Sequence, residues 1–229
     1  MTLRALLLGT ALLCPTLVIG QAPPNARECG QTSTIPFAKV AMRRLCSLAD
    51  KPEVRQATGA VDAMTLLGAA PPDVMWRIPD KDLLAFVSAF GESLAVVPDS
   101  LCADIYPHPG AAPWNQRFMV VAEAIDSGMA ERWSDFLEAW VWAVVHKAPL
   151  RPEASPAEAV AHIRAQSASL SLRERQDMGR LLRGEPLPAQ AACHVVRLTF
   201  QHYTMGPPDK AATTLRALMR GRAPWFVAT

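Results

Sequence analysis

Proline divides this chain into intervals more sharply than any other residue type. The sequence of 229 residues holds 20 prolines, and most of them gather in short clusters. A proline inside a helix loses a hydrogen bond and clashes with the preceding turn, so helices are confined to the stretches between the clusters. These stretches have helical lengths and are long for strands. They cover residues 53–70, 80–97, 114–148, 157–185, 189–206 and 209–223.

Apolar residues recur within these intervals at helical spacing. Trp133, Phe136, Trp140 and Val144 fall three or four residues apart, which places them on one face of a helix. Each such stripe needs a partner helix to cover it, so we expect an all-α fold, a single domain of about eight to ten helices. The expected helices are 37–49, 53–68, 80–96, 99–105, 115–127, 130–147, 156–168, 172–184, 189–205 and 208–220.

Two helix starts carry a capping box. Ser155 is followed by Glu158, and Ser171 by Glu174, so that in each pair serine and glutamate satisfy each other's backbone N–H groups. Asp80 precedes another expected helix, and its side chain is suited to cap it.

The first twenty residues indicate export. Arg4 precedes an apolar run from Ala5 to Ile19, and Gly20 supplies a small residue at the expected cleavage point. This is the arrangement of a secretory signal peptide, and the run is short for a membrane-spanning helix. We therefore expect a signal peptide over 1–20, an extended N-terminal arm over 21–36 and the all-α domain over 37–229. No transmembrane segment is expected in the mature chain, which we place in the periplasm or outside the cell.

Four cysteines remain after the leader, namely Cys29, Cys46, Cys102 and Cys193. An even number in an oxidising compartment favours two disulfides. Four cysteines allow three pairings; we favour Cys102 with Cys193 and Cys29 with Cys46. None of them forms a C-x-x-C pair, so no cysteine-rich metal site is expected.

Charge is nearly balanced but uneven along the chain. Residues 51–150 carry seven basic and thirteen acidic groups, whereas residues 151–229 carry eleven basic and six acidic groups. Such asymmetry is typical either of a binding face or of helices whose solvated faces differ. Nucleic acid is not expected as a partner, because the basic stretches lack interleaved aromatics. The arginines of the last helices suit either a patch for an anionic partner or a membrane surface, or solvated helix ends; they are Arg173, Arg180, Arg183, Arg216, Arg220 and Arg222.

Histidines and one carboxylate are the candidate catalytic residues. His194 and His202 lie about two helical turns apart and flank Arg197 and Gln201, which are candidate binding residues. This polar set lines a cleft or forms the solvent side of an amphipathic helix. Glu138 lies between apolar positions, where burial would disfavour its ionised form and suit it to act as a general acid; pairing with an arginine is the alternative.

A metal site is a further possibility that the spacing alone raises. Glu158 and His162 are four residues apart and would offer two ligands on one helix face, but no third ligand is visible nearby. No metal or cofactor is expected.

Function is less constrained than fold. The motifs of serine hydrolases, zinc proteases and nucleotide-binding proteins are absent from the sequence. We therefore expect a non-catalytic interaction protein: an inhibitor or immunity-type factor, or an envelope-assembly factor whose partner is another envelope protein. The alternatives are an enzyme acting on envelope material and a small-ligand binder with an aromatic-lined cavity near Trp133, Trp140 and Trp142.

Overall fold

The structure is a computed structural model that describes residue 29 and residues 33–69, 71, 73–105 and 114–220. The expected signal peptide at 1–20 lies outside the described residues, as does most of the expected arm at 21–36. In the described ranges the chain is all-α and forms no strand, which confirms the expected fold class. None of the described helices is long and apolar enough to cross a membrane.

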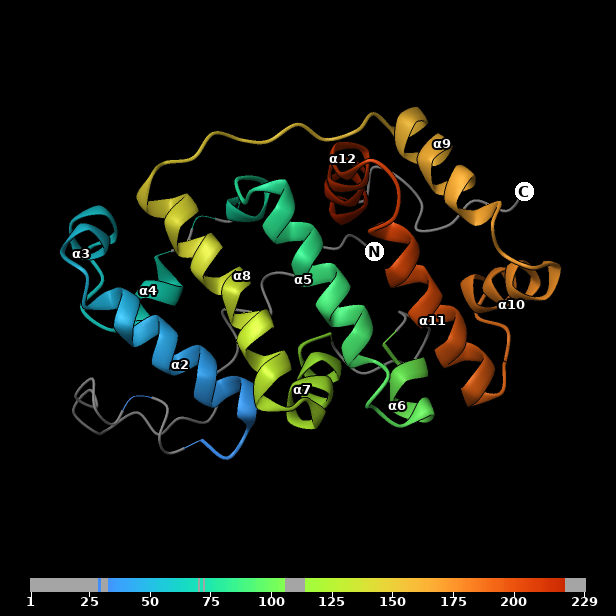
Figure 1. Ribbon diagram of the computed structural model, residues 1–229, viewed down its shortest axis with the longest axis horizontal. Coiled ribbons are helices and arrows are strands. Elements are labelled where there is room, and N and C mark those ends of the chain that lie inside the picture. The colour runs from blue at the N-terminus through green and yellow to red at the C-terminus, as the bar shows by residue number, and fades with distance from the viewer. Residues whose placement is uncertain (1–28, 30–32, 70, 72, 106–113, 221–229) are drawn as a thin grey trace.

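Eleven α-helices and one short 3-10 turn make up the described chain (Figure 1). Four helices lie side by side in the order α2, α8, α5, α11, and each packs on its neighbour. The bounds are α2 Pro36–Ala49, α3 Pro52–Thr58, α4 Ala63–Gly68, η1 Val74–Trp76, α5 Asp80–Ser93, α6 Asp99–Ala103, α7 Trp114–Ala124, α8 Ser127–Val145, α9 Pro156–Ser167, α10 Leu172–Leu182, α11 Ala189–Tyr203 and α12 Pro208–Met219.

An aromatic cluster occupies the space between α2, α5, α7 and α8. Trp133 is fully buried, and its ring lies 5.0–6.1 Å from the rings of Phe37, Phe86, Phe90 and Phe118. Its indole N–H donates to Ser93 Oγ at 3.1 Å, so the one polar atom of the ring is satisfied. The predicted apolar stripe of α8 therefore forms core.

Two disulfides brace the helices in the favoured pairing. Cys102 of α6 bonds to Cys193 of α11, 91 residues further along the chain, and Cys29 bonds to Cys46 of α2. Cys102 and Cys193 are both fully buried. The Cys102–Cys193 bond joins α6 and α11, which also pack on each other, so it reinforces a contact that packing already stabilises.

The expected helix over 53–68 is wrong as a single element. α3 ends at Thr58, and Gly59 follows with φ of 70°, the left-handed conformation that glycine adopts without steric cost. Asp62 then starts α4 with a capping box shared with Thr65. The interval from residue 53 to residue 68 lacks proline, but glycine also breaks helices. Gly59 therefore divides this interval into two helices.

Asp80 and Arg216 were also misassigned. Asp80 is the first residue of α5 and does not cap it through its side chain. Its carboxylate instead accepts from Arg216 of α12 at 2.7 Å, while Arg216 also donates to the backbone carbonyl of Ile78. Arg216 is completely buried, so it belongs to neither an exposed basic patch nor a solvated helix end.

Candidate functional site

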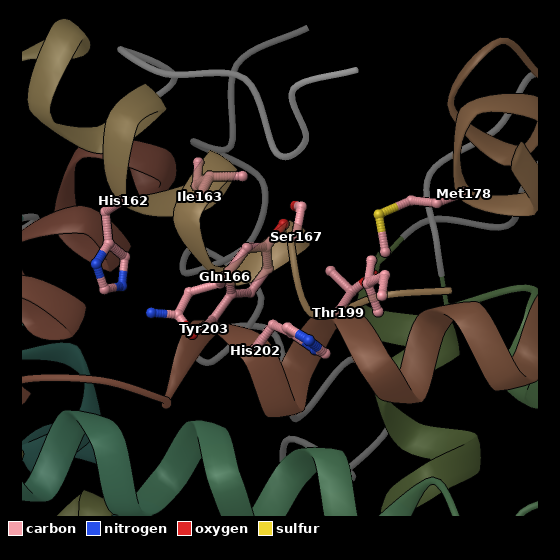
Figure 2. Close-up of a pocket in the computed structure, with 9 residues that line it drawn as sticks. His162, Ile163, Gln166, Ser167, Met178, Thr199, His202 and Tyr203 are labelled. Carbon is pink, nitrogen blue, oxygen red and sulfur yellow. The ribbon is translucent and has the colours of Figure 1, made fainter. Parts of the chain in front are cut away.

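A small hollow lies between α9, α10 and α11 (Figure 2). Side chains from three helices and the turn between α9 and α10 form its walls, and its volume of about 10 Å³ is room for about one water molecule. It is therefore a shallow depression and not a pocket for a whole small molecule. Its lining includes His162, Ile163, Gln166, Leu170, Met178, Thr199, His202 and Tyr203.

Local sequence explains how each helix contributes to the hollow. On α9, His162 and Gln166 are four residues apart and therefore lie on one face. On α11, Thr199, His202 and Tyr203 follow the same spacing. The capping boxes of Ser155 and Ser171 are present as predicted, and they fix where α9 and α10 begin.

His202 is the histidine with the most defined contacts in the hollow. Its Nδ1 lies 2.7 Å from the carbonyl oxygen of Leu198, and since a carbonyl only accepts, Nδ1 carries a proton. Its Nε2 lies 3.1 Å from Ser169 Oγ. The Ser169 hydroxyl also reaches the carbonyl oxygen of Gln166 at 2.8 Å. The arrangement pairs a hydroxyl with an oriented imidazole at an exposed turn.

His162 is enclosed on one side. Its Nε2 is buried and has no hydrogen-bond partner among the described residues. Burial lowers the pKa of His162, and the positive charge of Lys210 lowers it further. Glu158, the other half of the suggested metal pair, bonds to the backbone N–H of Ser155 at 2.8 Å. The described residues contain no group of three or more potential metal ligands.

His194 faces solvent on the outer side of α11. Its side chain is 58% exposed, and its Nε2 lies 3.0 Å from Glu174 of α10. This contact and the hydrogen bonds from Ser171 lower the pKa of Glu174 to about 2. His194 of α11 therefore contacts α10 through Glu174 and does not share the contacts of His202.

Arg197 and Gln201 lie four residues apart on one face of α11 but differ in exposure. Arg197 donates from two nitrogens to the carbonyl oxygen of Leu94, at 2.9 and 2.6 Å, and lies 3.6 Å from Asp99. It thus ties α11 to the turn between α5 and α6. Gln201 is exposed on α11. The polar set therefore lies along one side of α11, but its members have different partners: His194 contacts Glu174, Arg197 contacts Leu94 and His202 contacts Ser169.

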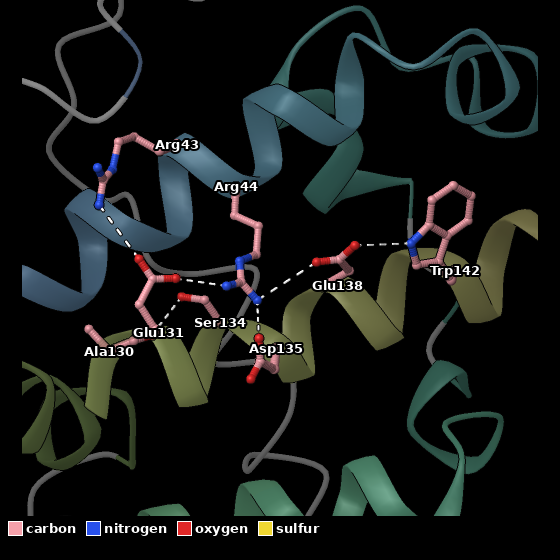
Figure 3. Close-up of polar contacts among 8 residues, drawn as sticks. All are labelled: Arg43, Arg44, Ala130, Glu131, Ser134, Asp135, Glu138 and Trp142. Atoms are coloured by element: carbon pink, nitrogen blue, oxygen red, sulfur yellow. Dashed lines mark hydrogen bonds and ion pairs between the residues drawn. The ribbon is translucent and has the colours of Figure 1, made fainter. Parts of the chain in front are cut away.

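Glu138 belongs to an ion-pair cluster between α2 and α8 (Figure 3). Glu131, Asp135 and Glu138 lie on one face of α8, and Arg44 of α2 contacts all three; the Arg44–Glu131 distance is 2.7 Å and the Arg44–Glu138 distance is 3.7 Å. Burial acts to lower the pKa of Arg44, but its hydrogen bonds and charge interactions with Asp135 and Glu131 outweigh that effect and raise it.

The Glu138 side chain is also held from its other side. It is 40% exposed, and it accepts a hydrogen bond from the indole N–H of Trp142 at 3.3 Å. Glu138 thus contacts both Arg44 and Trp142, which corresponds to the arginine-paired alternative that its sequence position allowed.

The three tryptophans named as possible cavity walls occupy different environments. Trp133 fills the aromatic core, and Trp140 is 7% exposed. Trp142 is half-buried at the surface, where the His146 ring stacks on it at 5.2 Å and Lys51 lies 4.8 Å from its centroid. The hollow described above lies elsewhere, between α9, α10 and α11.

Sequence reasoning missed the hollow because its walls come from separate helices. The spacing of His162 and Gln166, and that of Thr199 and Tyr203, are both visible in the sequence. Nothing in either spacing says that α9 packs on α11, a contact that only the folded chain shows.

Comparison with known proteins adds no relative. No protein-family model, curated protein or solved structure matches the chain. The class of protein that the fold defines is an all-α protein braced by two disulfides. Any more particular assignment rests on the chemistry of its own residues.

Proposed function

We propose that this chain is an exported, non-catalytic interaction protein of the periplasm or the extracellular space, an inhibitor or immunity-type factor or an envelope-assembly factor. The observation that carries the proposal is the pair of disulfides. Disulfides persist in oxidising compartments, which fits export through the leader expected at residues 1–20.

The disulfide arrangement also supports a role in binding. The Cys102–Cys193 bond joins α6 to α11, and Arg197 of α11 holds the turn that precedes α6 through the Leu94 carbonyl. Surfaces fixed in this way lose little conformational freedom when a partner binds, which favours affinity. The partner would be another protein of the cell envelope.

Mass spectrometry of the full chain tests the export step. The chain is produced with its own leader in a bacterial host, and the intact mass of the recovered product is measured before and after reduction. We expect a product that begins after Gly20 and gains four hydrogens on reduction, two for each disulfide. A product that keeps residues 1–20 and has all five of its cysteine thiols free, Cys14 of the leader included, would refute export.

Capture from the envelope tests the interaction step. Cells are crosslinked, the tagged chain is purified, and each captured protein is produced separately and mixed with it for native mass spectrometry. We expect at least one complex of defined stoichiometry to form again from the purified components. If no captured protein re-forms a complex, the proposed function is wrong.

A hydrolase acting on envelope material is the second candidate. The observation that favours it is the 3.1 Å contact between Ser169 Oγ and His202 Nε2, which becomes a nucleophile–base pair when the hydroxyl turns its proton from the Gln166 carbonyl to Nε2. A fluorophosphonate probe would then label Ser169, and the His202→Gln variant would lose the labelling. An unlabelled wild-type protein would exclude this activity.

A further inference from the structure

His162 of α9 carries a buried polar atom that the fold leaves without a partner. Its ring lines the hollow between α9, α10 and α11, and its Nε2 makes no hydrogen bond with any described residue (Figure 2). A neutral imidazole bears one proton, whereas an imidazolium bears a proton on both nitrogens. Protonated His162 would therefore place a charged donor in a buried position without an acceptor, which is strongly unfavourable.

The turn between α11 and α12 lies against this ring. A Cβ added at Gly206 would be 3.4 Å from Cε1 of His162 and 2.9 Å from Nε2 of Gln166, so the backbone of the turn contacts both side chains of α9. α12 also packs on α9. Hydrating a charge on the buried edge of the ring therefore requires that α9 and this turn move apart.

The charges around His162 oppose a proton on its ring. Burial lowers the pKa of His162, and the positive charge of Lys210 on α12 lowers it further. The described carboxylates on α9, on the segment before it and on α12 do not reverse this effect. They are Glu158, Glu153 and Asp209. From α10 only the apolar Met178 reaches the hollow.

On α11, the titratable side chains in the hollow are His202 and Tyr203, and His202 differs from His162 in its partners. Its Nδ1–H donates to the carbonyl oxygen of Leu198 at 2.7 Å, and its Nε2 lies 3.1 Å from Ser169 Oγ. Because a hydroxyl oxygen accepts as well as donates, a doubly protonated His202 has an acceptor for each N–H. His162 lacks this arrangement at Nε2.

α9 is the element that is free to respond. It buries only Ala159, Ile163 and Ser167, whereas α8 buries eight residues. The segment 148–155 that precedes it contains no helix and runs along the outside of the fold (Figure 1). Local opening occurs where few buried contacts hold an element in place.

We propose that protonation of His162 releases α9 from the turn between α11 and α12, so that the fold contains an acid-sensitive switch. The proton comes from solvent and binds the ring nitrogen that lacks one, and both N–H groups of the released ring are hydrated. Release uncovers Ile163, Leu170 and Tyr203, which are only 4–5% exposed while α9 is docked. The switch goes beyond the interaction function proposed above and does not depend on it.

The direction of the response follows from the docked and released forms. Released His162 has the usual histidine pKa of about 6.5, and docked His162 has a lower pKa. α9 therefore stays docked above about pH 6.5, and release becomes more favourable as the pH falls below that value. Between about pH 8 and about pH 5 the equilibrium for release increases at most about thirtyfold, the limit for a docked form that binds no proton.

Amide hydrogen exchange of the oxidised full chain measures this release. Exchange is followed by mass spectrometry at about pH 8 and about pH 5, on either side of the usual histidine pKa, and is corrected for its intrinsic pH dependence. We expect peptides from α9 to lose protection about five- to thirtyfold in acid, while peptides from α8 keep theirs. Unchanged protection of α9, or an equal loss in every helix, would overturn the proposal.

Substitution of the histidine tests its role directly. His162→Gln keeps a polar side chain that takes up no proton, so protection of α9 should differ less than about twofold between the two pH values. His146→Gln, at an exposed histidine directly after α8, is the control and should respond as the wild type does. Acid release of α9 that persists in His162→Gln would show that another group is responsible and overturn the proposal.

A second variant tests the switch without altering the buried ring. Lys210→Glu replaces a repulsive charge by an attractive one at an exposed residue, which raises the pKa of docked His162 and should reduce the acid response at least about twofold. Lys39→Glu makes the same change at an exposed residue of α2 and should leave the response unchanged. Equal responses in these two lysine variants would contradict the proposal.

Discussion

Arg216 shows how one residue depends on its tertiary setting. Its guanidinium is fully buried on α12, yet it donates to the Ile78 carbonyl at 2.8 Å, to Asp80 at 2.7 Å and to the Pro152 carbonyl at 3.4 Å. A buried charge is tolerated only with such partners. The residue therefore joins α12 to the start of α5 and to the extended segment before α9.

Removing that side chain should be costly. Arg216→Ala leaves two carbonyls and a carboxylate without their donor, and we expect a loss of about 3 kcal/mol in the free energy of unfolding. Urea denaturation measures it. Arg164→Ala, at an exposed residue that forms no ion pair with the described residues, is the control and should change stability by less than about 0.5 kcal/mol. A loss at Arg216 no larger than the control would contradict this account.

Glu174 makes stability depend on pH in a defined direction. The hydrogen bond to His194 and those from Ser171 lower its pKa from 4.5 to about 2 in the folded protein. Its contribution is therefore fully present above about 4.5 and is lost as the pH falls toward 2.

Substitution of Glu174 tests that dependence. Glu174→Gln should destabilise the protein above pH 4.5, and the difference from the wild type should shrink as the pH falls through 4.5 toward 2, since the wild-type carboxylate then protonates as well. Denaturation curves across this range measure it. Glu158→Gln neutralises the equivalent capping carboxylate, which has no histidine contact among the described residues, and should show a smaller effect of the same sign. A difference that stays constant with pH would refute the assignment.

Helix boundaries were predictable wherever a local signal marks them. The capping boxes at Ser155 and Ser171, and proline as the first residue of α9 and α12, are local features that the structure confirms. The division between α3 and α4 was missed because Gly59 is tolerated inside a helical pattern at modest cost. Its left-handed backbone is visible only in the folded chain.

Two glycine substitutions separate backbone strain from crowding at this division. No atom lies within 4 Å of a Cβ added at Gly59 or at Gly68, but only Gly59 has a positive φ. Gly59→Ala should cost about 1 kcal/mol because alanine is strained there. Gly68→Ala should be neutral or slightly stabilising. Thermal unfolding measures both, and equal effects would show that the conformation of Gly59 is not the cause.

At the scale of the whole molecule, α5 connects the two sides of the fold. It packs on α8 on one side and on α11 and α12 on the other. Gly91 permits the close approach to α11, since a Cβ there would lie 2.9 Å from Phe200 Cβ. The Cys102–Cys193 bond reinforces the same side.

The two disulfides should therefore contribute different amounts to the free energy of unfolding. In the loop-entropy model, a separation of 91 residues corresponds to about 4–5 kcal/mol and one of 17 residues to about 3 kcal/mol. Replacing Cys102 and Cys193 by alanine should lower the free energy of unfolding more than replacing Cys29 and Cys46. Calorimetry measures both, and we expect a single transition in the wild type. The reverse order of costs would contradict the model.

The sequence by itself determined the helical class, most helix starts and the possibility of two disulfides, because these depend on proline positions, capping residues and the number of cysteines. The folded chain decided which cysteines pair. The tertiary structure alone decided that Arg216 is buried, that Arg44 holds Glu138, and that α9, α10 and α11 enclose a hollow. Those features join residues that are distant in the chain, and helical periodicity states which face is apolar without stating which helix covers it.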